Sequence, residues 1–262
     1  MVQLACASLS AEGFSDSGFE KTFAVIPKAG YRFIEFNLWF GRMLLPSSVE
    51  HIARRCSETG MRAAAVYCTG LGGNPARIDI DVAHKLYAME VAERLGCSRV
   101  VTGGVQHGRG GTLAAAIETL ALIAPVAEQR GLKICLENHH RFTLDTIDDY
   151  VKVFEAVRQE CVGICIDTGH FDASAVDMDA VIDRLGERVN HIHVKENRAW
   201  GVQDFCRFGE GTTRNAHVVE RMIERGYDGF ITVEQSPQKD RETTVEDLEK
   251  PYELFSGYTN EG

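Results

Sequence analysis

Several features of other protein classes are missing from this sequence of 262 residues. None of its eight cysteines belongs to a Cys-x-x-Cys pair and most stand in apolar runs, so reduced cysteines are expected rather than a disulfide framework. The N-terminal segment MVQLACASLS has neither a basic region nor a long apolar region, so no signal peptide is expected. No window approaches roughly 18 uninterrupted apolar residues, so no membrane span is expected. These absences favour a cytoplasmic protein without a membrane partner.

Clusters of basic residues are also missing. The 28 Lys and Arg residues are scattered and are outnumbered by 38 Asp and Glu residues, which gives a net charge of −10. Binding to a phosphate backbone depends on clustered Lys and Arg, so no nucleic-acid partner is expected. The lack of an obvious group of basic residues that could hold a phosphate favours an unphosphorylated substrate.

What the sequence does contain is an even alternation of apolar, strand-like runs and amphipathic, helix-like segments. No low-complexity stretch, charge block or linker interrupts it, so residues 1–262 are expected to form a single domain with an ample core, since 44% of the residues are hydrophobic. The strand-like runs lie at 3–8, 31–38, 61–68, 97–103, 132–138, 162–168, 189–195 and 229–235, and the helix-like segments at about 17–29, 47–59, 80–95, 112–130, 146–160, 177–187, 213–226 and 243–256.

Eight such repeats in a chain of this length predict a parallel sheet closed into a (βα)8 barrel, also called a TIM barrel. An open, doubly wound sheet is the alternative, but the first strand-to-helix turn lacks the G-x-G-x-x-G pattern of that fold. Two capping boxes are predicted, Ser47 with Glu50 and Thr243 with Glu246. Left-handed glycine caps are predicted where helical segments end, at Gly30, Gly60, Gly96, Gly131 and Gly226.

Four successive late strands end in residues that can bind a metal. The run ICLE ends at Glu137, ICID ends at Asp167, HIHV contains His193, and ITVE ends at Glu234. One such ending would be unremarkable as the start of a solvated loop. Four endings in successive strands favour a site at the carboxyl ends of the barrel strands, where barrel enzymes hold their catalytic groups.

The alternation of side chains along each strand sharpens this prediction. The four candidate ligands share their strand faces with small or polar residues, namely Cys135, Cys165, His191 and Thr232, and the opposite faces are aliphatic. The aliphatic faces suit the helix ring, so the four ligands should point into the barrel. Three buried carboxylates repel one another unless a cation compensates them. Three carboxylates and one imidazole suit a divalent ion, Mn²⁺ first, with Mg²⁺, Co²⁺ or Zn²⁺ as alternatives.

The segments CLENHH, CIDTGH, HIHVKEN and GEGTTRNAHVVERMIERGYDGFITVEQ resemble the xylose isomerase-like TIM barrels. This sugar isomerase and epimerase superfamily also includes ketose 3-epimerases, hydroxypyruvate isomerases, inosose isomerases and endonuclease IV. The likeness covers essentially the whole chain, but its motifs are specific for the superfamily rather than for one activity. It implies a small carbohydrate substrate and, because relatives are often dimers or tetramers, a homo-oligomer.

The resemblance also implies roles for individual residues. Metal ligation falls on the four strand-end residues Glu137, Asp167, His193 and Glu234, and substrate contact falls on His170. Ketose 3-epimerases carry E-N-D-R after the seventh strand, whereas this chain has Arg198 one position earlier, which puts its grip on the sugar in doubt. His107 stands where one histidine of the three-zinc endonucleases falls, but the other motifs of those enzymes are absent, and we treat it as a candidate substrate contact.

The activity that the resemblance implies is that of an isomerase or epimerase of a small keto sugar or keto-polyol, whereas the spacing of the residues indicates only a metal site. Glu137 and Glu234 are expected to act as the acid/base pair that moves a proton through an enediolate. Lys195 and Glu35 are further candidates for substrate contact. The alternatives are a pairing of Lys195 with a carboxylate, and a bond from Glu35 to a metal ligand or in a structural salt bridge. His139 shares the inward face with Glu137 and could serve as an acid or base for a leaving group, which leaves open a lyase or dehydratase acting on a keto-sugar, keto-cyclitol or 3-keto-glycoside. A non-catalytic sugar-binding barrel is the third hypothesis.

Overall fold

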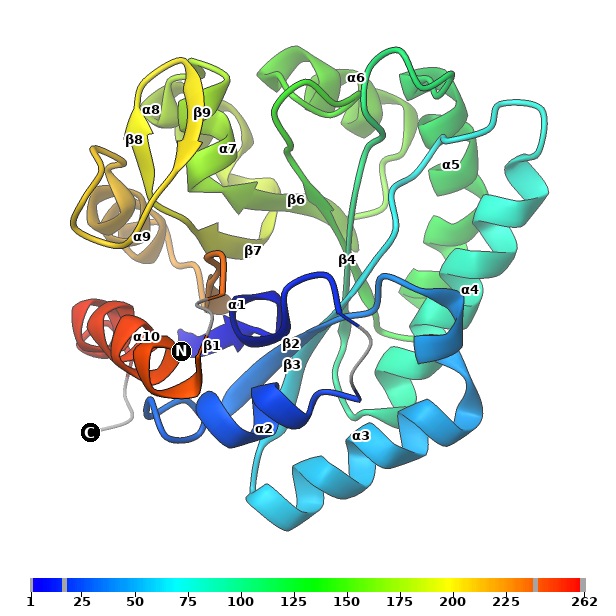
Figure 1. Ribbon diagram of the computed structural model, residues 1–262. Coiled ribbons are helices and arrows are strands. Elements are labelled where there is room, and N and C mark those ends of the chain that lie inside the picture. Colours follow the sequence, from blue (N-terminus) through cyan, green and yellow to red (C-terminus); the bar gives the residue numbers. More distant parts are fainter. Residues whose placement is uncertain (1, 16–17, 238–239, 260–262) are drawn as a thin grey trace.

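Eight parallel strands close into one barrel in the computed structural model, which describes residues 2–15, 18–237 and 240–259 (Figure 1). The barrel order is β1-β10-β7-β6-β5-β4-β3-β2, so successive strands of the chain are neighbours all the way round. The strands are β1 (Gln3–Ala7), β2 (Phe33–Asn37), β3 (Arg62–Cys68), β4 (Arg99–Gly103), β5 (Lys133–Glu137), β6 (Val162–Asp167), β7 (Val189–Val194) and β10 (Phe230–Val233). The predicted (βα)8 barrel is confirmed.

Helices form a ring outside the barrel (Figure 1). The larger ones are α3 (Pro46–Thr59), α4 (Ile78–Arg94), α5 (Leu113–Gln129), α6 (Ile147–Ala156), α8 (Met178–Leu185), α9 (Asn215–Glu224) and α10 (Arg241–Ser256). The first expected helix is reduced to α2 (Glu20–Val25), and short elements occur at α1 (Leu9–Glu12), α7 (Thr168–Ala173), η1 (Gly41–Leu44) and η2 (Gly186–Arg188). In the part of the chain that the structure describes, no helix is both long enough and apolar enough to cross a membrane.

The alternation of side chains along the strands separates two packing layers. Aliphatic residues such as Ile134, Leu136 and Ile164 belong to the large core between the barrel and the helix ring. A smaller cluster of Ala65, Tyr67, Val101, Cys135 and Cys165 fills the interior of the barrel. The predicted inward and outward faces are therefore confirmed, and all eight cysteines are free.

The amino end of the barrel is filled by aromatic rings. Phe33 and Phe230 contact each other with ring centroids 5.1 Å apart, beside Ala5 and Ala64. Because side chains plug this end, the space for a ligand lies at the other end, where the strands finish.

Four of the five glycine caps are confirmed, but Gly30 lies in a turn beyond the end of α2 at Val25 and does not cap that helix. Both predicted capping boxes are wrong. The five glycines have positive φ angles: Gly30, Gly60, Gly96, Gly131 and Gly226. Helix α3 starts at Pro46, with Leu45 in the capping position and no side-chain cap, because the proline fixes the first turn before Ser47. Helix α10 is capped instead by Asp240, whose carboxylate accepts the Thr243 N–H at 2.8 Å. The capping box that does form joins Thr146 and Asp149 at α6.

One hairpin departs from the simple repeat. The segment after β7, which the sequence suggests is a long loop, contains the antiparallel strands β8 (Asn197–Ala199) and β9 (Val202–Phe205). The hairpin lies beside α7 at the carboxyl end of the barrel (Figure 1). It therefore brings Phe205 to the same end as the four candidate ligands.

Candidate metal centre and active site

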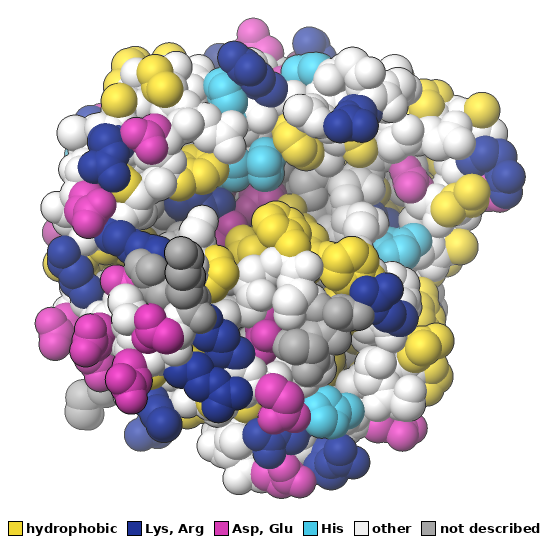
Figure 2. All heavy atoms as spheres, viewed as in Figure 1, with side chains coloured by type: hydrophobic (Ala, Val, Ile, Leu, Met, Phe, Trp, Pro, Cys, Tyr) yellow, Lys and Arg dark blue, Asp and Glu magenta, His cyan; other side chains and the backbone are white. Residues whose placement is uncertain are grey.

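A cavity of about 710 Å³ opens at the carboxyl ends of the barrel strands. Its floor includes Glu137 on β5, Lys195 directly after β7 and Glu234 directly after β10, and His139 and His170 form part of its wall. Acidic and histidine side chains are visible in the hollow near the centre of the face shown in Figure 2. The cavity is the size of a small-molecule site and is placed where barrel enzymes bind their substrates.

The four predicted metal ligands meet at the bottom of this cavity. One ligand atom from each of Glu137, Asp167, His193 and Glu234 lies within 4.8 Å of the others, and all four residues are buried. The Nδ1 atom of His193 is 2.8 Å from Glu137 Oε1, 3.2 Å from Glu234 Oε2 and 4.0 Å from Asp167 Oδ2. Carboxylate oxygens and an imidazole nitrogen that lie this close together can all bind the same ion.

The charges of the cluster also fit a divalent cation. Four carboxylates are buried together, those of Glu35, Glu137, Asp167 and Glu234. The cations facing them are His193 and Lys195, whose Nζ lies 2.8 Å from Asp167 Oδ2 and 2.7 Å from Glu234 Oε1. Acidic charge exceeds basic charge even when both cations are protonated, and buried charge of one sign is costly. The donor set of Glu137, Asp167, His193 and Glu234 therefore fits a divalent ion.

The excess of carboxylates over cations in the cluster also determines the protonation of His193. Burial alone would lower the pKa of its imidazole, but Cys165 and the carboxylates of Glu35 and Glu137 outweigh burial and raise that pKa well above the ordinary value. Burial also raises the pKa of the Cys165 thiol, which is therefore uncharged at neutral pH. The two carboxylates are thus the effective cause, and His193 carries a proton that a metal would replace.

Glu234 and Asp167 respond differently to this environment. Burial favours the neutral acid in both, but Lys195 and His193 outweigh it at Glu234 and lower the pKa of that carboxyl. At Asp167 burial, assisted by Glu234 and Glu137, outweighs Lys195 and raises the pKa. The pKa of Lys195 is raised because Asp167 and Glu234 outweigh the effect of its burial. Lys195 is therefore a permanent cation beside two candidate ligands.

Glu35 lies behind the cluster and outside the lining of the cavity. Its Oε2 atom is 3.0 Å from His193 Nε2 and 2.9 Å from His191 Nε2, and the side chain is completely buried. Burial raises the pKa of Glu35, but these two histidines outweigh it and lower the pKa to about 2. Of the alternatives for Glu35, the geometry provides the bond to a metal ligand rather than the substrate contact, because its position on β2 places the carboxylate against His193 Nε2. Glu35 thereby fixes the imidazole so that Nδ1 faces the carboxylates of Glu137 and Glu234.

Tyr67 is a residue of the site that the sequence analysis did not identify as functional. Its hydroxyl donates to Glu137 Oε2 at 2.6 Å, and its ring lines the cavity. Burial, together with the charge of Glu137, raises the pKa of Tyr67 well above the ordinary value, so it remains a donor. Alternation along β3 would have placed Tyr67 inside the barrel, but nothing in the sequence pairs it with Glu137.

Asn138 joins the ends of two neighbouring strands by hydrogen bonds. Its Nδ2 donates to the Asp167 carbonyl at 2.9 Å, and its Oδ1 accepts the Asp167 N–H at 2.7 Å. The pair ties the end of β5 to the end of β6, so Glu137 and Asp167 keep a fixed separation.

Replacement of Asn138 with alanine is expected to lower the free energy of unfolding by about 2–4 kcal/mol, because two buried backbone groups of Asp167 lose their partners. Urea denaturation of the metal-free protein measures the change. Asn190→Ala is the control, since the Asn190 amide makes a single hydrogen bond, to the Cys161 carbonyl, and should cost about 1 kcal/mol. Equal losses in the two variants would contradict the bridging role.

Two stacked histidines form part of the cavity wall. The rings of His139 and His170 are 3.6 Å apart, and His170 Nδ1 accepts the backbone N–H of His140 at 3.3 Å. Burial, with a contribution from Lys195, lowers the pKa of His139 to about 4 and that of His170 well below the ordinary value. Both rings are therefore neutral near pH 7. Because Nδ1 of His170 is an acceptor, its proton is on Nε2.

The structure separates the last two candidates for substrate contact. Arg198 lines the cavity, but its guanidinium is exposed and lies 3.2 Å from Asp204 Oδ2 and 3.4 Å from Glu210 Oε2. His107 is exposed on the loop after β4 and is not among the cavity-lining residues. His107 is therefore not brought together with the rest of the site.

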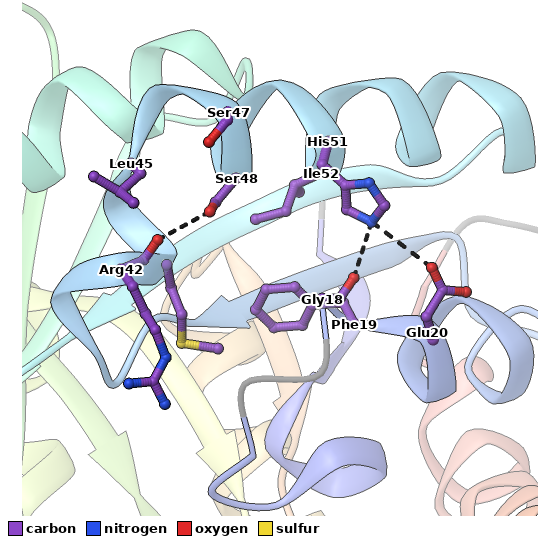
Figure 3. A pocket seen from close by; sticks show the side chains of 10 residues that line it. Gly18, Phe19, Glu20, Arg42, Leu45, Ser47, Ser48, His51 and Ile52 are labelled. Carbon is purple, nitrogen blue, oxygen red and sulfur yellow. Dashed lines mark hydrogen bonds and ion pairs between the residues drawn. The ribbon is translucent and has the colours of Figure 1, made fainter.

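A second hollow, of about 390 Å³, lies between α2, η1 and α3 (Figure 3). There His51 Nε2 lies 3.1 Å from the Gly18 carbonyl and 3.8 Å from Glu20 Oε1 (Figure 3). In the described part of the chain this hollow contains no group of three metal-capable side chains. The chemistry-bearing residues are gathered in the larger cavity.

Sequence relatives cover part of the chain. It is 28% identical over 143 residues to an uncharacterised protein of Methanocaldococcus jannaschii, a match that spans 53% of this chain and 48% of that protein. It is 26% identical over 125 residues to the inosose dehydratase of Clostridium beijerinckii, 42% of each chain. The chain thus spans less than half the length of these curated relatives.

Solved structures match over nearly the whole length. The IOLI protein with a bound zinc atom has a TM-score of 0.80 at 17% identity and 98% and 99% coverage of the two chains. The D-allulose 3-epimerase of Methylomonas sp., in complex with D-allulose, has a TM-score of 0.78 at 19% identity, with 98% and 97% coverage. A 3-keto-D-glucoside 4-epimerase from E. coli has a TM-score of 0.78 at 15% identity, with 97% and 100% coverage. These likenesses show a shared fold.

The family is shown by a match over most of the sequence. The family model for the xylose isomerase-like TIM barrel matches residues 23–252, which include every strand of the barrel except β1 and all four candidate ligands. The resemblance of the four strand-end motifs is thereby confirmed, and the chain belongs to the xylose isomerase-like TIM barrel family.

Proposed function

We propose that this protein is a divalent-metal-dependent isomerase or epimerase of a small keto sugar or keto-polyol. The observation that carries the proposal is the placement of two carboxylates, Glu137 and Glu234, on the floor of one cavity, both close to His193. They come from β5 and from the end of β10, which are separated in the barrel by β6 and β7. A carbon held between them could lose a proton to one carboxylate and receive one from the other.

A divalent ion held by Glu137, Asp167, His193 and Glu234 would supply positive charge where the substrate oxygen becomes negative. Mn²⁺ is the proposed ion, because three carboxylates and one imidazole are hard or borderline donors. Zinc, which the related IOLI structure contains, is the alternative.

The protein's own groups divide the remaining work. Glu234, whose pKa is lowered by Lys195 and His193, is ionised and able to accept the proton from the carbon beside the carbonyl. Tyr67 holds Glu137 Oε2 by a hydrogen bond and so orients the other oxygen, Oε1, which lies beside His193. The His170 Nε2–H is available to a substrate hydroxyl. Lys195 places a fixed positive charge beside Glu234.

A lyase is the second candidate. His139 lines the same cavity, and its buried Nδ1 has no hydrogen-bond partner within the described part of the chain. In β-elimination, a carboxylate would remove the proton beside the carbonyl, the carbon–oxygen bond at the next carbon would break, and the carboxylic acid so formed would return the proton to the departing oxygen, which a neutral histidine could hold by a hydrogen bond. The relatives named inosose dehydratase are consistent with this chemistry.

Turnover in deuterium oxide distinguishes these reactions. The purified protein, loaded with Mn²⁺ or treated with chelator, is incubated with ketoses, keto-cyclitols and 3-keto-glycosides, and the products are analysed by mass spectrometry and NMR. We expect metal-dependent appearance of one solvent deuterium in a rearranged sugar. Loss of a substituent would identify the lyase instead. The absence of exchange with every compound would reject both reactions and favour a binding protein.

A further inference from the structure

The cavity extends well beyond its acidic floor. Glu137 and Glu234 at the floor are 2% and 5% exposed, whereas Phe14 at the mouth is 72% exposed. The intervening volume of about 710 Å³ lies in the upper part of the range of roughly 300–1,000 Å³ found for small-molecule pockets. One sugar ring over the carboxylates would leave the outer part of this cavity unfilled.

An aromatic ladder lines one side from the floor to the mouth. Tyr67, which contacts Glu137, lies 4.9 Å from Trp39, and Trp39 lies 4.9 Å from Phe14, measured between ring centroids. Phe205 of the β8–β9 hairpin lines the same cavity. A phenylalanine that is mostly exposed gains no burial energy in the free protein. It would gain that energy when a flat ligand ring covers it.

Two polar atoms along this path have no hydrogen-bond partner among the residues that the structure describes. Trp39 Nε1 is a buried donor without an acceptor, and Gln235 Oε1 is a buried acceptor without a donor. Gln235 is 5% exposed, and its Nε2 is fixed by the Asp247 carbonyl at 3.2 Å. Buried polar groups are normally paired, so two unpaired groups on side chains that line the cavity point to a ligand that carries hydroxyl groups.

The charged residues at the mouth are already engaged. Arg198 pairs with Asp204 and Glu210, and Arg207 lies 3.2 Å from Asp247 Oδ2. Each of these guanidinium groups is already paired with a carboxylate, so the outer cavity does not resemble a phosphate-binding site. Its dominant groups are aromatic rings.

We propose that the substrate is a keto-glycoside with an aromatic aglycone, and this inference rests on the proposed function. The sugar ring lies over Glu137 and Glu234, its oxygens meet Trp39 Nε1 and Gln235 Oε1, and the aglycone stacks on the Phe14 and Trp39 rings. Phe14 is then a binding residue of the outer subsite and takes no part in the proton transfer.

The experiment separates binding from turnover. Dissociation constants of the Mn²⁺-loaded protein are measured calorimetrically for methyl and phenyl D-glucosides and D-galactosides, which lack the keto group and cannot react. The phenyl glycoside that binds best is expected to bind at least about 10-fold more tightly than its methyl counterpart. Phe14→Ala should reduce this ratio to about 3 or less, and Phe14→Tyr, which keeps the ring, should preserve it. Leu122→Ala, an exposed change on α5, should have no effect.

The same pairs in their 3-keto form then report on the reaction. Equal affinity for phenyl and methyl glycosides, an unchanged ratio in Phe14→Ala, or no binding of any phenyl glycoside would overturn the outer subsite even if simple ketoses are turned over. A preference for phenyl glycosides without any deuterium exchange in the 3-keto pairs would reject the proposed reaction and leave the subsite standing.

Discussion

Replacement of Glu234 with glutamine is expected to lower kcat by about 10²- to 10⁴-fold, the range typical for loss of a general acid or base. The amide has the same shape and can still offer an oxygen to a metal, but it cannot accept a proton. Lys195 and His193 keep the pKa of the Glu234 carboxyl low, so the native residue is ionised over the working pH range. The variant should therefore lose turnover more than substrate affinity.

The measurement pairs steady-state kinetics with metal content. Mn²⁺ occupancy, determined by atomic absorption on the same sample, distinguishes lost proton transfer from lost metal. Glu249→Gln, which neutralises an exposed carboxylate on α10, is the matched control and should keep the native rate. A Glu234→Gln enzyme that holds metal and turns over at the native rate would remove Glu234 from the acid/base role.

Glu137 offers a second comparison within this prediction. Its carboxyl is held by the Tyr67 hydroxyl and by His193, whereas Glu234 is held by Lys195 and His193. An epimerase uses its two carboxylates in opposite directions. Glu137→Gln and Glu234→Gln are therefore expected to differ in which of two epimeric substrates still exchanges its proton with solvent.

The barrel and the ligand set were predictable because both follow from local periodicity. Alternation along β5, β6, β7 and the last strand assigns Glu137, Asp167, His193 and Glu234 to the inward face, and closure of the barrel brings four strand ends to one place. No contact between particular side chains is needed for that inference.

The residues that contact the candidate metal ligands were harder to predict from the sequence. Whether Glu35 meets the substrate or His193 depends on how deep the end of β2 lies relative to β7, and those strands are not neighbours in the barrel. The pairing of Tyr67 with Glu137 likewise crosses the interior between β3 and β5. Loop geometry was harder still, because the chain length after β4 does not show that His107 remains exposed.

Asp167 provides the sharpest test of the metal centre. Its negative charge should destabilise the metal-free protein but should be needed for the protein to bind the metal. Its carboxylate is buried beside Glu137 and Glu234, and burial together with these acids raises its pKa even though Lys195 is close. Asp167→Asn removes that charge but keeps an oxygen to accept the His170 N–H, which Asp167 Oδ1 receives at 2.9 Å. Lys195 retains Glu234 as its partner.

Two thermal unfolding curves are expected to separate the roles. Without metal, the Asp167→Asn protein should unfold at the same temperature as the native protein or higher. With Mn²⁺ at about 100 times its dissociation constant, the native protein should gain about 2.7 kcal/mol, and the variant should lose most of that gain. Asp172→Asn, a buried change outside the cluster that can still accept from Asn197, should keep it. An Asp167→Asn protein that is stabilised by Mn²⁺ as strongly as the native protein would show that Asp167 is not a ligand, because removal of one of four donors must weaken a site that depends on all of them.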